Sequence, residues 1–165
     1  RRDINSMAGN KVSFVDGESG EYDLILLATG YQLDYPFIDR KHLNWPAQVD
    51  APQLYMNVFH PQYDNLFMMG MIEAAGLGWE GRNQQARLAA LYIHQRQQCS
   101  PAALQFAETK RQQATSNLDG GYDYIKLARM AYYVNKDAYL AALNQHITAL
   151  EAELQASTPE PVAAT

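Results

Sequence analysis

Three glycines near the middle of the chain offer the first candidate for chemistry. Gly76, Gly78 and Gly81 match the spacing G-x-G-x-x-G, which cradles the pyrophosphate of a dinucleotide where a strand leads into a helix. A dinucleotide fold also needs a second strand with an acidic residue about twenty positions further on. A helical run that contains Cys99 and Ser100 stands there instead. We therefore interpret this stretch as a turn of small residues and not as a dinucleotide fingerprint.

A second group of small residues, Ala28-Thr29-Gly30, ends an apolar run. Small residues at the end of a buried strand let another backbone or a ligand approach closely. The same three residues also occur at ordinary strand ends of α/β proteins, so by themselves they leave both interpretations open.

The histidines and the single cysteine predict neither a metal site nor a reactive thiol. The four histidines are scattered without the spacing of metal ligands. They are His42, His60, His94 and His146. Cys99 has no catalytic partner in the sequence, and one cysteine cannot form an internal disulfide, which is typical of a reducing compartment.

Composition excludes several other classes of protein. The 165 residues are 47% hydrophobic and 19% charged, as in globular domains. A net charge of −5 argues against a nucleic-acid partner or an anionic membrane. No apolar run reaches the about 20 residues of a membrane helix, and no signal peptide is evident. We therefore expect a cytoplasmic protein. Because the chain begins with Arg1, we also expect it to be part of a longer parent.

Strand-like patterns dominate the first half. Residues 11–15 alternate polar and apolar, and Asp16-Gly17 provides a turn. The continuous apolar run at 22–28 predicts a strand that is buried on both faces. Residues 54–59 and 65–72 are two further expected strands.

The second half has helical patterns. We expect helices over about 83–97, 101–116 and 123–133, and a last one from after Asn135 to about 155. Ser100-Pro101 supplies an N-cap and an N1 proline. The last helix carries one apolar stripe, made of Leu140, Leu143, Ile147, Leu150 and Leu154.

Several blocks, in order, carry a resemblance to a known family. A strand pattern leads into Ala28-Thr29-Gly30-Tyr31, and Pro36-Phe37 follows soon after. The other blocks are 12–17, 54–61, 65–72, 84–90 and 122–125. Together they resemble flavin-containing monooxygenases over about residues 10 to 135. The two glycine-rich fingerprints of that family would lie upstream of this region.

The resemblance implies an α/β fold that is the C-terminal part of a two-dinucleotide-binding-domain flavoprotein. Residues 1–35 would end the NADPH-binding domain with a hairpin and a buried strand. Residues 36–98 would be the C-terminal return of the FAD-binding domain. Residues 99–156 would form a helical extension, and 157–165 a disordered tail.

The resemblance also implies an activity for the parent protein. It would use FAD, NADPH and O2 to insert one oxygen atom into a small organic substrate. The phosphate-binding loops are not in this sequence, so we expect the chain alone to retain neither cofactor and to be inactive. Its partner would be the N-terminal part of the parent.

The resemblance assigns two groups of cofactor-binding residues and no catalytic residue. The group at the junction of the two cofactors is Ala28, Thr29, Gly30 and Tyr31. The group against the flavin ring is Gly70, Met71, Ile72, Glu73, Ala74, Gly76 and Gly78. In the family a helix begins after this block and points its positive end at the flavin's pyrimidine side, where reduced flavin is anionic.

Two side chains in this block are open to more than one interpretation. A carboxylate at Glu73 would oppose an anionic flavin unless it were paired or protonated, and the alternative is that it faces solvent. Trp79 is either a wall of the substrate pocket or a packing residue under the helix, and we favour packing.

Two other functions compete with this prediction. The apolar stripe could pair with a partner helix in a non-enzymatic interaction module. Two heptads are short for a stable coiled coil, so we favour docking on the same chain and leave self-association through the C-terminal helices open. A flavin-dependent reductase without oxygenation would share the strand and the Ala-Thr-Gly turn.

Overall fold

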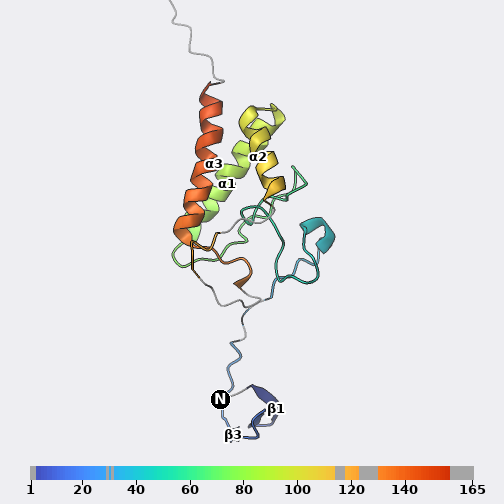
Figure 1. Ribbon diagram of the computed structural model, residues 1–165. Helices are drawn as coiled ribbons and strands as arrows, with labels where there is room; N and C mark the ends of the chain where they lie inside the picture. Colours follow the sequence, from blue (N-terminus) through green and yellow to red (C-terminus); the bar gives the residue numbers. More distant parts are fainter. Residues whose placement is uncertain (1–2, 29, 31, 114–117, 123–129, 157–165) are drawn as a thin grey trace, which may run out of the picture. The chain divides into compact units, whose positions relative to one another are not determined.

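A computed structural model describes residues 3–28, 30, 32–113, 118–122 and 130–156. The chain divides into two compact units, Arg1–Tyr31 (unit 1) and Gln32–Thr165 (unit 2). Among the described residues, a three-stranded antiparallel sheet belongs to unit 1 and three α-helices belong to unit 2, so the chain is of mixed α/β composition (Figure 1).

Unit 1 is built around the sheet β1-β2-β3, with strands Ile4–Ala8, Lys11–Phe14 and Ser19–Glu21. In β2 the side chains of Val12 and Phe14 are buried and those between them are more exposed, which confirms the predicted half-buried strand. The backbone N–H of Glu18 donates to the Asp16 carboxylate, and Gly17 has a φ of +87°. These are the turn properties expected of Asp16-Gly17.

The prediction of a buried strand at 22–28 is wrong for this structure. The segment is extended but pairs with no strand, and all its residues are exposed, with Leu24 84% and Leu26 86% accessible. A strand buried on both faces needs neighbouring strands and a covering layer on each side. The described residues of the chain provide neither for this segment.

The described part of unit 2 contains α1 (Gly78–Gln97), α2 (Pro101–Gln112), α3 (Lys136–Ala156) and the short 3-10 helix η1 (Arg40–Leu43). Ser100 caps α2 by accepting from the Ala103 N–H, with Pro101 in the first turn, as predicted. Asn135 accepts from the Ala138 N–H before α3. Both helix starts are therefore confirmed. α2 ends at Gln112, and Gln113 is not helical, so the helix expected to about residue 116 is shorter than predicted. Most of the helix expected at 123–133 and the tail from 157 lie outside the described residues.

The two strands predicted at 54–59 and 65–72 are replaced by irregular, tightly folded chain. Met56 and Asn57 have φ values of +54° and +56°, so the chain reverses, and Tyr55 pairs with Phe59 in an isolated bridge. Phe59 in turn pairs with Phe67. Left-handed backbone inside the first segment and at Gly70 in the second interrupts the extended conformation that a strand needs.

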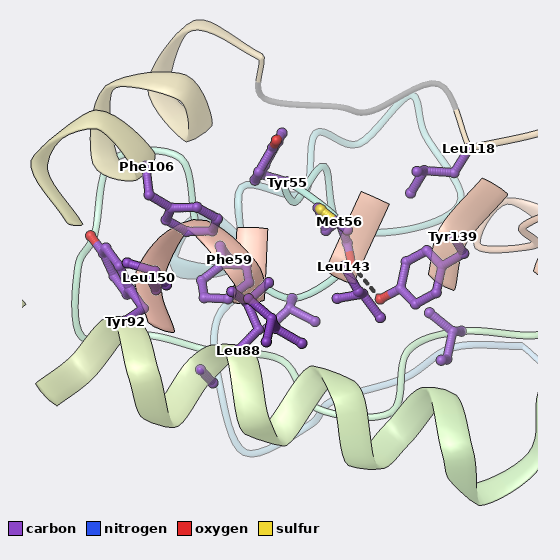
Figure 2. Packing of buried hydrophobic residues seen from close by; sticks show 14 of the residues in the cluster. Tyr55, Met56, Phe59, Leu88, Tyr92, Phe106, Leu118, Tyr139, Leu143 and Leu150 are labelled. Carbon is purple, nitrogen blue, oxygen red and sulfur yellow. Dashed lines mark hydrogen bonds between the residues drawn. The ribbon is translucent and has the colours of Figure 1, made fainter. Parts of the chain in front are cut away.

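The core of unit 2 lies between the helices and this irregular segment. Leu143, Ile147 and Leu150 of the α3 stripe are at most 3% exposed, and Figure 2 shows Leu143 and Leu150 among the side chains of the core. Phe59 and Phe106 pack edge to face, with ring centroids 4.8 Å apart. The stripe is thus buried within its own chain, as favoured. None of the described helices is long and apolar enough to cross a membrane.

Candidate functional site

The candidate site is built on residues 70–78, which we call the glycine turn and which lead directly into α1. The side chains of Met71 and Ile72 are buried, and that of Ile72 belongs to the core of unit 2. Gly70, Gly76 and Gly78 have φ values of +79°, +74° and +50°, a left-handed conformation that favours glycine. A Cβ atom built on Gly76 or Gly78 would meet nothing within 4 Å. The turn therefore presents bare backbone to open space.

The third glycine of the G-x-G-x-x-G spacing has a different role. Gly81 is buried in the first turn of α1, and a Cβ there would lie 2.5 Å from the Leu77 side chain. Leu77 itself is 2% exposed. Gly81 is thus required for the packing of Leu77 under the helix, which supports treating the spacing as a turn. α1 begins at Gly78, five residues before the predicted start.

The N-terminus of α1, the positive end of its helix dipole, lies at the glycine turn and has Glu80 in its first turn. Leu77 occupies the cap position and provides no side-chain hydrogen bond to the first backbone N–H groups. The Arg82 guanidinium donates to the Gly78 carbonyl at 2.8 Å, and its Nε lies 3.9 Å from a Cβ built on Gly70. A helix N-terminus without a side-chain cap and the nearby Arg82 guanidinium favour an anionic or electron-rich ligand.

Arg82 was missed by the sequence analysis, although it left a signal. Arg82 is the fifth residue of α1, and an arginine near a helix start opposes the positive end of the helix dipole.

The side chains of Glu73 and Trp79 both face outward. The Glu73 side chain is exposed, which is the solvent-facing alternative, while its backbone pairs with Tyr133 in a parallel bridge. Trp79 is 86% exposed, so the prediction that it packs under the helix is wrong. Its neighbours Gly78 and Glu80 are also exposed, and the buried position below the helix is taken by Leu77.

A buried relay of hydrogen bonds fixes the start of the glycine turn. The Gly70 N–H donates to Gln85 Oε1 at 3.0 Å, and Gln85 Nε2 donates to the Tyr139 hydroxyl at 2.6 Å. The Tyr139 hydroxyl donates to the Met56 carbonyl at 2.8 Å, drawn as a dashed line in Figure 2. Gln85 and Tyr139 are fully buried.

The other predicted group, at 28–31, belongs to unit 1. Ala28 and Gly30 are exposed, and Gly30 has a φ of +78°. Thr29 and Tyr31 lie outside the described residues. Residues 70–78 belong to unit 2, so the two predicted groups lie in different units. Only the residues of the second group form one continuous site, the glycine turn.

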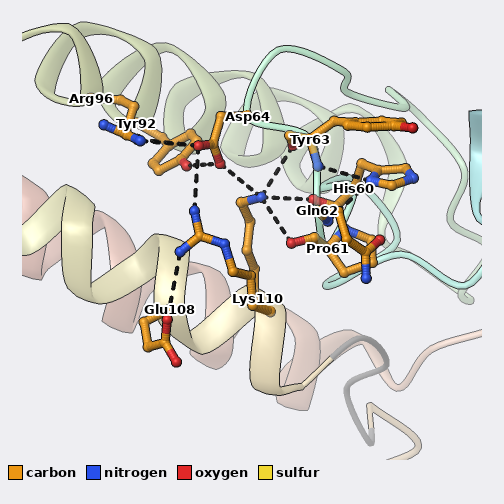
Figure 3. A network of polar contacts seen from close by, with 10 residues as sticks. His60, Pro61, Gln62, Tyr63, Asp64, Tyr92, Arg96, Glu108 and Lys110 are labelled. Atoms are coloured by element: carbon orange, nitrogen blue, oxygen red, sulfur yellow. Dashed lines mark hydrogen bonds and ion pairs between the residues drawn. The ribbon is translucent and has the colours of Figure 1, made fainter.

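A polar cluster around Lys110 fastens the 60–64 segment to α1 and α2 (Figure 3). The fully buried ammonium group of Lys110 donates to the carbonyls of His60, Pro61 and Tyr63 at 2.8–3.2 Å and lies 2.9 Å from Asp64 Oδ1. Its donors are therefore all satisfied within the protein. We assign this cluster a structural role.

Asp64 also binds Tyr92 and Arg96. Burial alone would raise the pKa of Asp64, but hydrogen bonds from Lys110 and Tyr92 and the Lys110 charge lower it to about 2. Burial, with the nearby Lys110 charge, lowers the pKa of His60. The Nδ1 atom of His60 accepts two backbone N–H groups, those of Gln62 and Tyr63, which is also a structural use.

A cavity of about 820 Å³ lies between α2, α3 and the 55–56 turn. At its wall the Tyr55 hydroxyl and His146 Nε2 are 2.7 Å apart. Burial raises the pKa of Tyr55 and lowers that of His146, so this pair is neutral near pH 7. None of the predicted site residues that the structure describes lines the cavity. Across the described ranges, no three metal-ligating side chains come together.

Comparison with known proteins gives a family match over most of the chain. The family model described as FMO-like, flavin-binding monooxygenase-like, matches residues 1–153. No solved structure matches the chain.

Proposed function

The chain belongs to the flavin-binding monooxygenase-like family, and from this premise we propose that its glycine turn is the contact surface for the isoalloxazine ring of FAD. At the level of the family, membership implies a flavin-dependent monooxygenase. Beyond that level, we propose that the protein uses NADPH and O2 to oxygenate a small organic substrate in the cytoplasm.

One observation supports the flavin contact above all others. The backbone of Gly76 and Gly78 faces open space at a helix start that lacks a side-chain cap. A planar ring can approach bare backbone closely, whereas a Cβ at either position would fill that space. The chemistry of the donors also fits, because backbone N–H groups and Arg82 suit the electron-rich pyrimidine end of a flavin.

Each group then has a definite task. FAD, when bound, supplies the redox chemistry that activates O2. The α1 N-terminus and Arg82 stabilise negative charge that develops at the ring. The buried side chains of Met71 and Ile72 hold the turn to the core, and Trp79 stands at the exposed edge as a wall for substrate. We propose Ala28, Thr29, Gly30 and Tyr31 for the NADPH side.

The apolar segment of unit 1 supports a further part of the proposal. Leu24, Leu26 and Leu27 are between 67% and 86% exposed, and consecutive exposed leucines mark a surface that another element covers. We propose that a preceding part of a longer parent chain covers it and carries the phosphate-binding loops. On that proposal the chain alone does not retain FAD.

A pair of glycine substitutions in the full-length protein tests the flavin contact. Gly76→Val places a branched side chain on the open face, and we expect lost flavin or NADPH oxidation that is uncoupled from product formation. Gly121→Val is the matched control, because Gly121 also has a positive φ, +81°, with no atom within 4 Å of a built Cβ. Both variants carry backbone strain of about 1–3 kcal/mol.

Flavin content, thermal unfolding and the ratio of product to NADPH consumed are measured on the same samples. Equal flavin content and equal coupling in the two variants would remove the glycine turn from the flavin site. NADPH oxidation by the unaltered protein without any oxygenated product, across a panel of amines, sulfides and ketones, would favour the flavin-dependent reductase instead.

A further inference from the structure

In the relay from Gly70 to Met56, the Tyr139 hydroxyl determines the orientation of the Gln85 side-chain amide. The Tyr139 hydroxyl has a single proton, and that proton is donated to the Met56 carbonyl. Its oxygen can then only accept from Gln85, so the NH2 of Gln85 must face Tyr139. The Oε1 atom of Gln85 is thereby left facing Gly70, whose N–H it accepts.

The reverse orientation of Gln85 would be costly. It would place the amide NH2 against the Gly70 N–H, two donors facing each other, and Oε1 against an oxygen that has no proton left to give. A buried donor that loses its partner costs about 1–3 kcal/mol. Gln85 and Tyr139 are fully buried and Gly70 is half-buried, so water cannot readily replace the bond between Gln85 and Tyr139.

A second attachment holds the glycine turn three residues later. The Glu73 N–H donates to the Tyr132 carbonyl at 3.4 Å, and the Val134 N–H donates to the Glu73 carbonyl at 3.0 Å. The Asn57 side chain also donates to the Tyr132 carbonyl, at 3.3 Å. The chain leading into α3 therefore holds Glu73 by its backbone, while Tyr139 in the first turns of α3 holds Gly70 through Gln85.

The two attachments divide the glycine turn into a fixed part and an open part. Gly70 and Glu73 are fastened to the chain around α3, whereas Gly76 and Gly78 have open space before them. The position of the open part depends on where the fixed part is held. A shift of about 1 Å at the fixed part is enough to misplace a reacting group.

We infer that Tyr139 is a positioning residue, which sets the place of the flavin-facing backbone by fixing the amide orientation of Gln85. This inference rests on the proposed function for its consequence at the flavin, but the attachment of Gly70 is a property of the protein without cofactor. Tyr139 of α3 thus positions the flavin-facing backbone through Gln85, and no atom of α3 needs to contact the ring.

A comparison of two buried tyrosines tests the inference in the full-length protein. Tyr139→Phe removes the hydroxyl of the relay. Tyr92→Phe is the matched control, because Tyr92 is also fully buried and also loses one hydrogen bond, to Asp64, which keeps Lys110 and Arg96. Hydrogen–deuterium exchange of the cofactor-free protein is followed in the peptide that contains Gly70, and the visible flavin spectrum is recorded after loading with FAD.

We expect Tyr139→Phe to speed exchange at Gly70 on the order of tenfold, as for a lost hydrogen-bond partner, and to shift the flavin spectrum. Tyr92→Phe should leave both unchanged even if it lowers the melting temperature. Gln85→Leu and the double variant Gln85→Leu/Tyr139→Phe should exchange at the same rate, because the two residues act as one unit.

The exchange measurement and the flavin measurement separate the two proposals. Unchanged exchange at Gly70 in Tyr139→Phe, or equal acceleration in Tyr92→Phe, would overturn the positioning role. Flavin content and coupling that do not respond to Gly76→Val would instead overturn the flavin contact, whatever the exchange data show.

Discussion

Two apolar parts of the chain meet opposite environments. In unit 1 the segment 24–27 is extended and exposed, whereas in unit 2 the residues Leu143, Ile147 and Leu150 of α3 are almost inaccessible. The helix satisfies its own backbone and needs only one apolar surface, which α1 and α2 provide. The extended segment needs partners for both its backbone and its two faces. Hydrophobicity alone therefore does not predict burial. Whether an apolar segment is buried also depends on how many packing surfaces and backbone hydrogen-bond partners it needs.

We expect the largest effect from a charge placed in the buried apolar stripe of α3. Ile147→Asp places a charge at a position that is 3% exposed, and we expect the free energy of unfolding to fall by about 3–5 kcal/mol. Thr148→Asp, one residue on and exposed, is the control. Urea unfolding followed by circular dichroism measures both. A similar small loss in the two variants would mean that the stripe is not part of the core.

An intermediate effect is expected at the ion pairs, all of which lie in unit 2 among the described residues. Asp64→Asn leaves the buried Lys110 without its counter-charge and should cost about 2–3 kcal/mol at pH 7. The pKa of Asp64 is lowered from 3.8 to about 2, so its contribution is complete above pH 4. It is lost as the pH falls from about 4 to 2.

Unfolding of the Asp64→Asn variant and of the unaltered protein is therefore measured at several pH values between 2 and 7. The difference in stability should be constant above pH 4 and should narrow below it. A difference that stays constant down to pH 2 would show that the Asp64 carboxylate is not held by Lys110 and Arg96.

The smallest effect is expected in the exposed segment. Leu26→Ser should change the stability of the 165-residue chain by less than about 0.5 kcal/mol, because Leu26 is 86% exposed. The same substitution in a longer parent protein should be destabilising, since we propose that a preceding part covers this segment. Parallel melting curves check both expectations, and an equally small effect in the two proteins would contradict the proposed cover.

The sequence predicted best those elements whose signals are local. Ser100-Pro101 and the spacing of the α3 stripe each report on residues a few positions away, and the structure has α3 and the start of α2 where they were expected. The turn at Met56 and Asn57 was missed, because left-handed φ values at two non-glycine residues leave no mark in the apolar pattern. The buried Lys110 was also missed, since lysine is almost always a surface residue.

The candidate site was predictable only in part, for the same reason. The glycines at 76 and 78 are visible in the sequence, and their open backbone agrees with a turn of small residues. The attachments of that turn join Gln85 to Tyr139, 54 positions apart, and Tyr139 to Met56, 83 positions apart. No local spacing encodes such pairs, so Gln85 and Tyr139 look like ordinary helix residues until the helices are placed in contact.

These long separations also order events during synthesis. The chain leaves the ribosome from its N-terminus at about 5–20 residues per second, so the glycine turn emerges well before Tyr139. Until α3 has emerged and docked, the Met56 carbonyl cannot accept from the Tyr139 hydroxyl. The Gln85 amide then lacks the hydrogen bond that fixes its oxygen toward Gly70. The Gly70 end of the turn is therefore among the last parts of unit 2 to become fixed, and a nascent chain that stops short of residue 139 lacks the attachment through Gln85 and Tyr139.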